Sequence, residues 1–311
     1  MSLADRISLQ NAENYNDPED FFGSGLGTIF PDEELNLHGE PGQSLVYISP
    51  HLSAPLVLRL CDPTLEEDRT LFSHYLWNAS LLLAELIEAD TLGVPLGGTT
   101  TMTAGPPRLR PDVSFSVAGR RVVELGSGAG LGSTMAGLVG ARRVVATDYP
   151  SETVLAPLRD NVRRGVCAAS APRLRHRRHR RPSVEVEVEV EGHAWGALDD
   201  AFSTRERHAF DRVVAADVLW MPRQHANLRR SVDRLLSRDP AARAWIVGAL
   251  HTGRAAMALF LDPDELASLG LAVEHIWERD CHGVEREWNE MRDEDAAYKK
   301  RWLVMIVLKR I

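Results

Sequence analysis

The sequence is poor in cysteine and has no long apolar run, and each absence excludes a class of protein. Its three cysteines, Cys61, Cys167 and Cys281, are too far apart for a metal-binding or redox pair, so we expect reduced thiols in an intracellular protein. No apolar stretch approaches the ~20 residues of a membrane-spanning helix, and the N-terminus lacks the basic and apolar parts of a signal peptide. These features predict a cytosolic protein without a membrane partner, with the nucleus as the alternative location.

Basic residues are outnumbered as well. The chain of 311 residues has 36 Lys and Arg against 44 Asp and Glu, and this net charge of −8 argues against a general nucleic-acid-binding surface. One basic run, residues 173–181, breaks the pattern. We expect a solvated loop there, and the alternatives are an RNA contact, a nuclear address or a site for an acidic protein. With 44% hydrophobic residues, the chain can bury the core of one large domain.

Glycine, in contrast, is concentrated in one short stretch. An apolar run beginning at Arg121 reaches Glu124 and gives way to glycines at alternating positions, Gly126, Gly128 and Gly130, with Ser127 between the first two. This pattern predicts a buried strand, a tight turn and the start of a helix. A turn with so few side chains lets a ligand lie against the backbone, and the amides of a helix N-terminus favour a nucleotide or a nucleotide-like cofactor.

The spacing of the glycines excludes two common nucleotide sites. The dinucleotide fingerprint G-x-G-x-x-G/A needs a third small residue where this chain has Leu131, or Ser133 in the alternative register, and no phosphate-binding Gly-Lys-Ser/Thr is present. A second apolar run, residues 143–147, ends in Asp148, 148 − 126 = 22 positions after Gly126. An acid at this place suits hydrogen bonds to the two hydroxyls of a ribose that carries no 2′-phosphate.

These residues resemble the first two motifs of the seven-strand S-adenosylmethionine-dependent methyltransferases. The wider sequence resembles the fungal proteins called nicotinamide N-methyltransferase-like, which belong to the same family as protein lysine and N-terminal methyltransferases. The resemblance extends from about Asn14 to Ile311. The further motifs that carry it are His74-Tyr-Leu-Trp-Asn-Ala79, Asp148-Tyr-Pro150, His193-Ala-Trp-Gly196, Ala216-Asp-Val-Leu-Trp-Met-Pro222 and His251-Thr-Gly-Arg254.

The resemblance implies an α/β fold, with a Rossmann-like, mostly parallel sheet of seven strands and helices on both faces. Two short β-type runs, residues 44–48 and 55–60, predict an N-terminal β-hairpin extension. We therefore divide the chain into an N-terminal extension, residues 1–73, and a methyltransferase domain, residues 74–311. Phe21, Phe22 and Phe30 lie in the polar segment 1–45, which is expected either to fold over the mouth of the site or to pack outside the core.

Apolar periodicity places the remaining elements of the predicted sheet and its helices. Helices are expected from His74 to about Glu88, from about Leu131 to Val139, and from Glu152 to Arg164, where the last of these contains Pro157. The strict alternation of valine and glutamate in residues 184–190 predicts a strand at the sheet edge. The other expected strands are residues 210–217, 244–250, 271–277 and 302–308, and Trp288 between the last two is a candidate lid.

The predicted cofactor site contains residues from several of these segments. The glycine motif and the following acid contribute Glu124, Gly126, Ser127, Gly128, Gly130, Asp148 and Tyr149. The resemblance adds Trp77, Trp195 and Ala216, with Trp195 placed beside the adenine, and the cofactor is then S-adenosylmethionine. We expect no metal site.

The acceptor side is expected at the motif that begins with Asp217. Asp217-Val-Leu-Trp220 occupies the place of a D-x-x-Y/F motif in the related protein methyltransferases. Asp217 is the candidate for orienting or deprotonating an amine, and Trp220 for packing beside it and the sulfonium. Bonding of Asp217 to the backbone at its strand end is the alternative. His251 is expected either to touch the substrate or to be bonded locally.

Three functions fit these residues. The first is an N-methyltransferase acting on a protein amine, a lysine or an N-terminal α-amine, with a translation factor as one candidate substrate. The second is a small-molecule N-methyltransferase acting on nicotinamide or another heterocycle. The third is a protein that binds the cofactor without turnover. A monomer is expected in each case.

Overall fold

The structure is a computed structural model, and it describes residues 2–10, 36–96, 108–173, 186 and 188–311. The three phenylalanines of the N-terminal segment and all of the basic run except Arg173 lie outside the described residues.

A mixed sheet of eight strands forms the centre of the fold, in the order β12-β11-β13-β10-β9-β6-β7-β8. Five neighbouring strands of the sheet, β10, β9, β6, β7 and β8, run parallel to one another. Strand β13 runs antiparallel to both of its neighbours, and β12 runs antiparallel to β11. The strands are β6 (Arg121–Leu125), β7 (Arg143–Asp148), β8 (Val188–Gly192), β9 (Arg212–Ala216), β10 (Arg243–Ala249), β11 (Leu271–Asp280), β12 (Glu285–Glu287) and β13 (Trp302–Arg310).

The prediction of seven strands was therefore wrong by one. The additional strand, β12, consists of Glu285, Arg286 and Glu287 and pairs with the outer side of β11. A strand of three charged residues has neither an apolar run nor an alternating pattern, so periodicity gives no sign of it. An edge strand is present where it was expected, since β8 pairs only with β7 among the described strands. It runs from Val188 to Gly192, and residues 184, 185 and 187 of the predicted strand lie outside the described residues.

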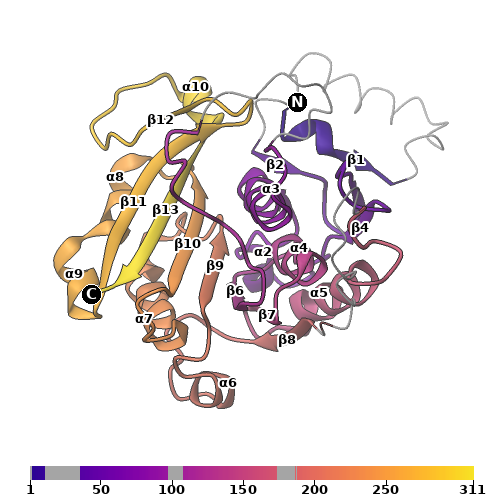
Figure 1. The fold of residues 1–311 in the computed structure, drawn as a ribbon, viewed down its shortest axis with the longest axis horizontal. Helices are drawn as coiled ribbons and strands as arrows, with labels where there is room; N and C mark the ends of the chain where they lie inside the picture. Colours follow the sequence, from indigo (N-terminus) through magenta and orange to yellow (C-terminus); the bar gives the residue numbers. More distant parts are fainter. Residues whose placement is uncertain (1, 11–35, 97–107, 174–185, 187) are drawn as a thin grey trace.

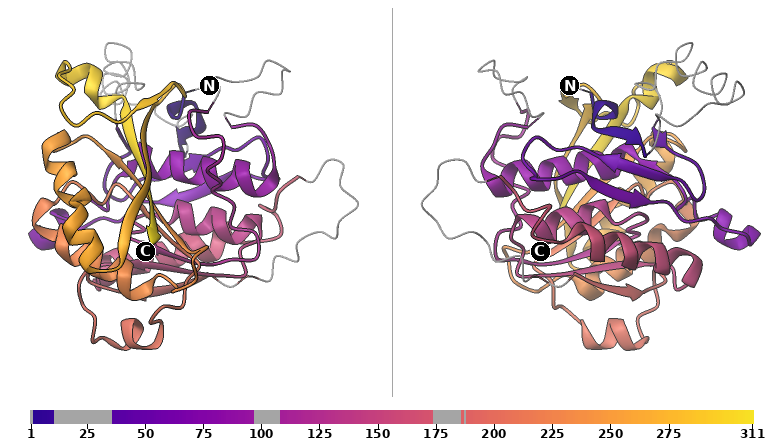
Figure 2. Two further views of the ribbon diagram at one scale, coloured as in Figure 1. Left: turned by 60° about the vertical axis from the view of Figure 1, so that its left-hand side comes forward. Right: turned by 90° about the vertical axis from the view of Figure 1, so that its right-hand side faces the viewer.

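Helices cover both faces of the sheet, as expected (Figures 1 and 2). The alternation of side chains along each strand supplies both layers: Val122 of β6 packs into the same hydrophobic cluster as α3 and α4, and Val123 into the cluster of α7. One face carries α3 (Asn78–Leu92), α4 (Leu131–Val139) and α5 (Glu152–Gly165), and the other carries α7 (His225–Leu235), α8 (Arg254–Ala258) and α9 (Pro263–Ser268). Pro157 lies inside α5, which continues through it.

The predicted N-terminal hairpin is confirmed, with one strand added. β3 (Ser44–Tyr47) pairs antiparallel with β4 (Leu56–Arg59), and β1 (Ile7–Leu9) pairs with the other side of β3. This small sheet packs against α5 (Figure 2). Its buried side chains join the same hydrophobic cluster as α3. The division of the chain after residue 73 stays a prediction.

The helix expected from His74 begins only at Asn78. Leu76 and Trp77 instead form the short strand β5, which pairs with β2 (Leu37–His38). The pairing keeps Trp77 in an extended conformation immediately before α3.

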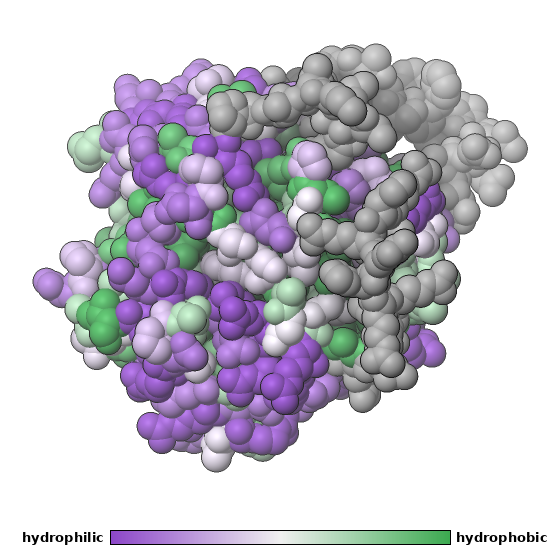
Figure 3. Space-filling view, in the orientation of Figure 1, coloured by the Kyte–Doolittle hydropathy of each residue, from purple (hydrophilic) through white to green (hydrophobic). Residues whose placement is uncertain are grey.

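In the described part of the chain, no helix has the length and apolarity that a membrane crossing requires. The lower part of the face in Figure 3, where α6 (Ala201–Arg205) lies, is predominantly hydrophilic.

Candidate active site

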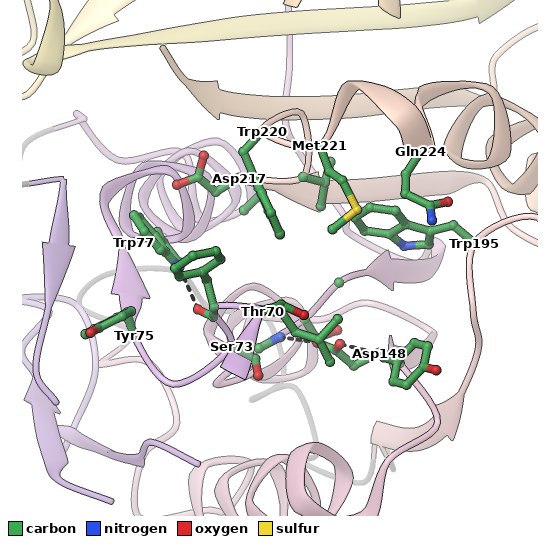
Figure 4. Close-up of a pocket in the computed structure, with 18 of the residues that line it drawn as sticks. Thr70, Ser73, Tyr75, Trp77, Asp148, Trp195, Asp217, Trp220, Met221 and Gln224 are labelled. Carbon is green, nitrogen blue, oxygen red and sulfur yellow. Dashed lines mark hydrogen bonds between the residues drawn. The ribbon is translucent and has the colours of Figure 1, made fainter. Parts of the chain in front are cut away.

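A cavity of about 470 Å³ opens at the carboxyl ends of β6, β7 and β9 (Figure 4). β6 lies between β7 and β9, so the chain changes direction across the sheet at this point. Open α/β sheets bind ligands at such a switch point, and the volume is within the range of about 300–1,000 Å³ for small-molecule sites. The predicted site residues that line the cavity are Trp77, Gly126, Ser127, Gly128, Asp148, Tyr149, Trp195, Ala216, Asp217 and Trp220.

The glycine turn forms the floor of one end, which we call the donor end and define by Gly126, Gly128 and Asp148. Gly126 has a φ of +68°, and a Cβ there would lie 3.0 Å from Cγ1 of Val218 and 3.1 Å from Cζ2 of Trp195. Only glycine therefore allows the indole of Trp195 to approach the turn this closely. The carboxyl end of β6 and the loop after β8 meet at this contact.

Asp148 ties the end of β7 to the glycine turn. Its Oδ2 accepts the N–H of Gly128 at 2.7 Å, and its Oδ1 accepts the N–H of Tyr149 at 2.7 Å. Burial raises the pKa of Asp148, and the two N–H groups partly oppose this rise. Each carboxylate oxygen keeps acceptor capacity beyond its one backbone bond, so the side chain can also bond two hydroxyls from the cavity.

Glu124 and Gly130, also predicted to bind cofactor, do not line the cavity. Glu124 is fully buried. Its Oε2 accepts two hydrogen bonds from Ser133, one from the backbone N–H at 2.8 Å and one from the hydroxyl at 2.5 Å. It thereby satisfies an unpaired amide in the first turn of α4. Burial raises the pKa of Glu124 to about 7 against the opposing effect of these bonds. A Cβ on Gly130 would collide with Leu158. Both residues support the glycine turn through contacts with the protein interior, outside the cavity. Their contact with a ligand stays a prediction.

The opposite end of the cavity, which we call the acceptor end, contains Trp77, Asp217 and Trp220 (Figure 4). The contact of Trp77 with the cofactor, which the resemblance implies, stays a prediction. The rings of Trp220 and Phe72 meet edge to face, with centroids 5.1 Å apart. Trp77 donates its indole N–H to the carbonyl of Phe72 at 3.1 Å. Asp217 and Phe72 both have positive φ, +58° and +53°, although neither is glycine. Such strained residues cluster at functional sites.

Sequence reasoning missed one wall of the cavity. This wall is the segment around α2 (Glu66–Arg69) and before β5, which the prediction assigned to the N-terminal extension. Its only regular element is a helix of four charged residues, so it carries no apolar periodicity. The lining residues of this wall are Glu66, Glu67, Thr70, Leu71, Phe72 and Ser73. Lining residues elsewhere in the cavity that the prediction also missed include Tyr75, Ser80, Ala129, Met221, Arg223 and Gln224.

His193, in contrast, has a local role at the base of the cavity. Its ring nitrogens bond Asp200 at 3.1 Å and Ser231 at 3.0 Å, and burial lowers its pKa. Within the described part of the chain, no group of three or more His, Cys, Asp or Glu side chains could hold a metal ion.

The order of the strands, the glycine turn after β6 and the acid at the end of β7 define a methyltransferase-type Rossmann-like fold. A solved structure of a Streptococcus mutans protein, proposed to be an S-adenosylmethionine-dependent methyltransferase, has this fold too. The match covers 94% of the present chain and 65% of the Streptococcus mutans chain, with a TM-score of 0.51 and 8% sequence identity. At this low identity, the match shows a shared fold alone.

The chain belongs to the lysine methyltransferase family, whose pattern matches residues 64–262. Its relatives include fungal proteins named protein N-terminal and lysine N-methyltransferase EFM7. The Eremothecium gossypii protein is 30% identical over 181 residues, which cover 58% of the chain and only 56% of that protein's own length. The Schizosaccharomyces pombe protein is 25% identical, covering 67% and 68%, and the Yarrowia lipolytica protein 26% identical, covering 81% and 80%.

These findings confirm the family inferred from the motifs. The narrower label, nicotinamide N-methyltransferase-like, has no support from these relatives, whose names describe protein amines.

Proposed function

We propose that the protein is an S-adenosylmethionine-dependent N-methyltransferase that acts on a protein amine, either a lysine or an N-terminal α-amine. The observation that carries the proposal is that one cavity contains both groups of residues. The glycine turn and Asp148, which is placed to bond a ribose, lie at one end, and Asp217 and two tryptophans lie at the other. Membership of the lysine methyltransferase family and the names of the fungal relatives support it.

The donor end fits S-adenosylmethionine by its shape and by the hydrogen-bonding and aromatic groups that it presents. The space that a Cβ on Gly128 would occupy is open, so a ligand can lie against the backbone there. Asp148 offers acceptors for two ribose hydroxyls, and Trp195 offers an aromatic face for adenine. The bound cofactor would supply a methyl group on a positively charged sulfur, which leaves without covalent help from the protein.

The acceptor end would align an amine and exclude water from it. Transfer of the methyl group from the sulfonium sulfur to the amine requires a free lone pair on the amine nitrogen, which forms the new N–C bond as the S–C bond breaks. An α-amine with a pKa of ~7.7–8.0 releases its proton more easily than a lysine at ~10.4. Asp217 would orient the amine by accepting its N–H. The rings of Trp220 and Trp77 would pack beside the positive charge, which aromatic faces attract. Alignment and desolvation then provide most of the rate enhancement.

Methyl-labelled S-adenosylmethionine tests this function. The protein is incubated with the label and, in separate reactions, with a fungal protein extract or with nicotinamide, and the Asp148→Ala variant serves as a control. Label in a protein band supports the proposal, and peptide mapping then separates lysine from α-amine acceptors. Label in a small soluble product favours the heterocycle instead. Cofactor binding without transfer to either contradicts an enzymatic role.

Some finer features belong to the proposal and are open to the same experiments. They are a translation factor as the protein substrate, a cytosolic location and a monomeric state. Size-exclusion chromatography with light scattering tests the last of these directly.

A further inference from the structure

The carboxylate of Asp217 is held by contacts from β10. The backbone of Asp217 has a φ of +58°, and its N–H donates to the carbonyl of Val247 at 2.7 Å. Its Oδ1 accepts the N–H of Ala249 at 3.1 Å, and only 3% of the side chain is exposed. Oδ2 has a side-chain partner instead.

That partner is His251, in the loop that follows β10. Its Nε2 lies 2.9 Å from Oδ2 of Asp217. Because an ionised carboxylate only accepts hydrogen bonds, this geometry assigns the proton to Nε2. The imidazole also contacts Trp77 edge to face, with centroids 4.9 Å apart. One ring thus contacts both the carboxylate and the aromatic wall of the acceptor end.

The loop that carries His251 is anchored by a buried ion-pair network. Arg254, the first residue of α8, is 4% exposed in its side chain and bonds both oxygens of Glu278 at 2.6 and 2.8 Å. Its Nη2, which donates to Glu278, also donates to Glu294 at 2.7 Å, and its guanidinium lies 5.1 Å from the ring centre of Trp288. Nε of Arg254 is buried without a hydrogen-bond partner, so the network is not fully satisfied. Such a buried ion pair fixes geometry more than it adds stability. The position of His251 is therefore set by contacts outside the cavity.

We propose that His251 is a positioning residue of the acceptor end, an inference that rests on the proposed function. Its Nε2–H holds the carboxylate of Asp217 in one orientation, and its ring edge holds Trp77. The acceptor amine then meets a carboxylate and an aromatic wall whose relative geometry is fixed before it binds. Cofactor binding, which uses the donor end, does not depend on this contact.

Two substitutions of His251 separate positioning from packing. His251→Phe keeps a ring against Trp77 and removes the hydrogen-bond donor, whereas His251→Gln keeps an N–H donor. His275→Phe is the matched control, since His275 also faces an aspartate, Asp112 at 3.8 Å, and has a similarly exposed side chain at 26% against 24% for His251.

We expect His251→Phe to lower kcat for a protein acceptor by about 10- to 100-fold, the effect of losing a hydrogen bond to a charged group. The Kd for S-adenosylmethionine should stay at its wild-type value, whereas the melting temperature should fall, because the buried carboxylate of Asp217 loses a partner. His251→Gln should recover most of kcat, and His275→Phe should match the wild type. In a double-variant cycle, Asp217→Asn combined with His251→Phe should cost little more than Asp217→Asn alone. Wild-type kcat in His251→Phe, or an equal loss of cofactor affinity, would overturn the proposal.

A second readout is independent of turnover. Nitrogen-15 NMR of labelled histidines should show Nε2 of His251 protonated, and Asp217→Asn should move this signal more than that of His275. A signal that does not respond to Asp217→Asn overturns the proposal, whatever the kinetics. If the wild-type protein transfers no methyl group to any acceptor, the proposed function fails, and the NMR result alone decides whether Asp217 and His251 act as a pair.

Discussion

Gly126 offers a direct test of the glycine turn, because one added methyl group meets two residues of the cavity. In Gly126→Ala the new Cβ would lie 3.0 Å from Val218 and 3.1 Å from Trp195, on a backbone with a φ of +68°. The left-handed conformation costs an L-residue roughly 1–2 kcal/mol, and moving packed side chains to relieve such contacts costs about 1–3 kcal/mol more. We therefore expect the free energy of unfolding to fall by about 2–5 kcal/mol.

Gly119→Ala is the matched control for this substitution. Gly119 has almost the same φ, +67°, and a Cβ there would meet nothing within 4 Å. This variant should lose only the conformational part, roughly 1–2 kcal/mol. Urea unfolding measures both losses, and calorimetry with S-adenosylmethionine should show weaker binding only in Gly126→Ala, because only there is Trp195 displaced. Equal stability and equal affinity in the two variants would refute the steric reasoning.

Three further predictions concern single side chains. Asp148→Ala removes the acceptors for the N–H groups of Gly128 and Tyr149 and for the ribose hydroxyls. Because a hydrogen bond to a charged group contributes about 1.5–3 kcal/mol, the affinity for the cofactor, measured by calorimetry, should fall at least 10-fold. An unchanged affinity would contradict the assignment. Trp220→Ala should lower kcat/KM for the acceptor in steady-state assays without changing cofactor affinity, and a loss in both would mean that Trp220 supports the whole cavity. The folded-state pKa of Glu124, about 7 against an ordinary 4.5, means that stability should fall as pH rises from about 4.5 through 7. Glu124→Gln should remove this fall and stabilise the protein above pH 7 by up to about 3 kcal/mol, so a pH dependence unchanged in urea unfolding would refute the role of its ionisation.

The donor end could be predicted because its geometry is encoded locally. β7 and α4 have the bounds that the sequence predicted, Arg143–Asp148 and Leu131–Val139. A strand buried on both faces reads as a continuous apolar run, and a turn that requires positive φ reads as glycine. The turn, its cap and the following acid all lie within one strand-helix-strand unit.

Other elements depend on contacts that no local pattern records. Leu76 and Trp77 continue the apolar spacing of α3, yet they form a strand because β2 pairs with them from 40 residues upstream. β12 exists because its backbone completes the edge of β11, whatever its side chains are. Tertiary pairing overrides local propensity in both cases.

The acceptor end shows why the identity of the acceptor is harder to infer than that of the donor. Its parts come from the ends of β5, β9 and β10, and Asp217 and His251 are 34 positions apart in the chain. β9 and β10 are parallel neighbours, so their carboxyl ends must meet, and the strand order implied by the family places the two residues near each other. The hydrogen bond between them requires more, namely the positive φ of Asp217 and the fixed loop before Arg254. The motif that begins with Asp217 therefore predicts where the acceptor binds, whereas the shape of that end of the cavity is set by residues that the motif does not contain.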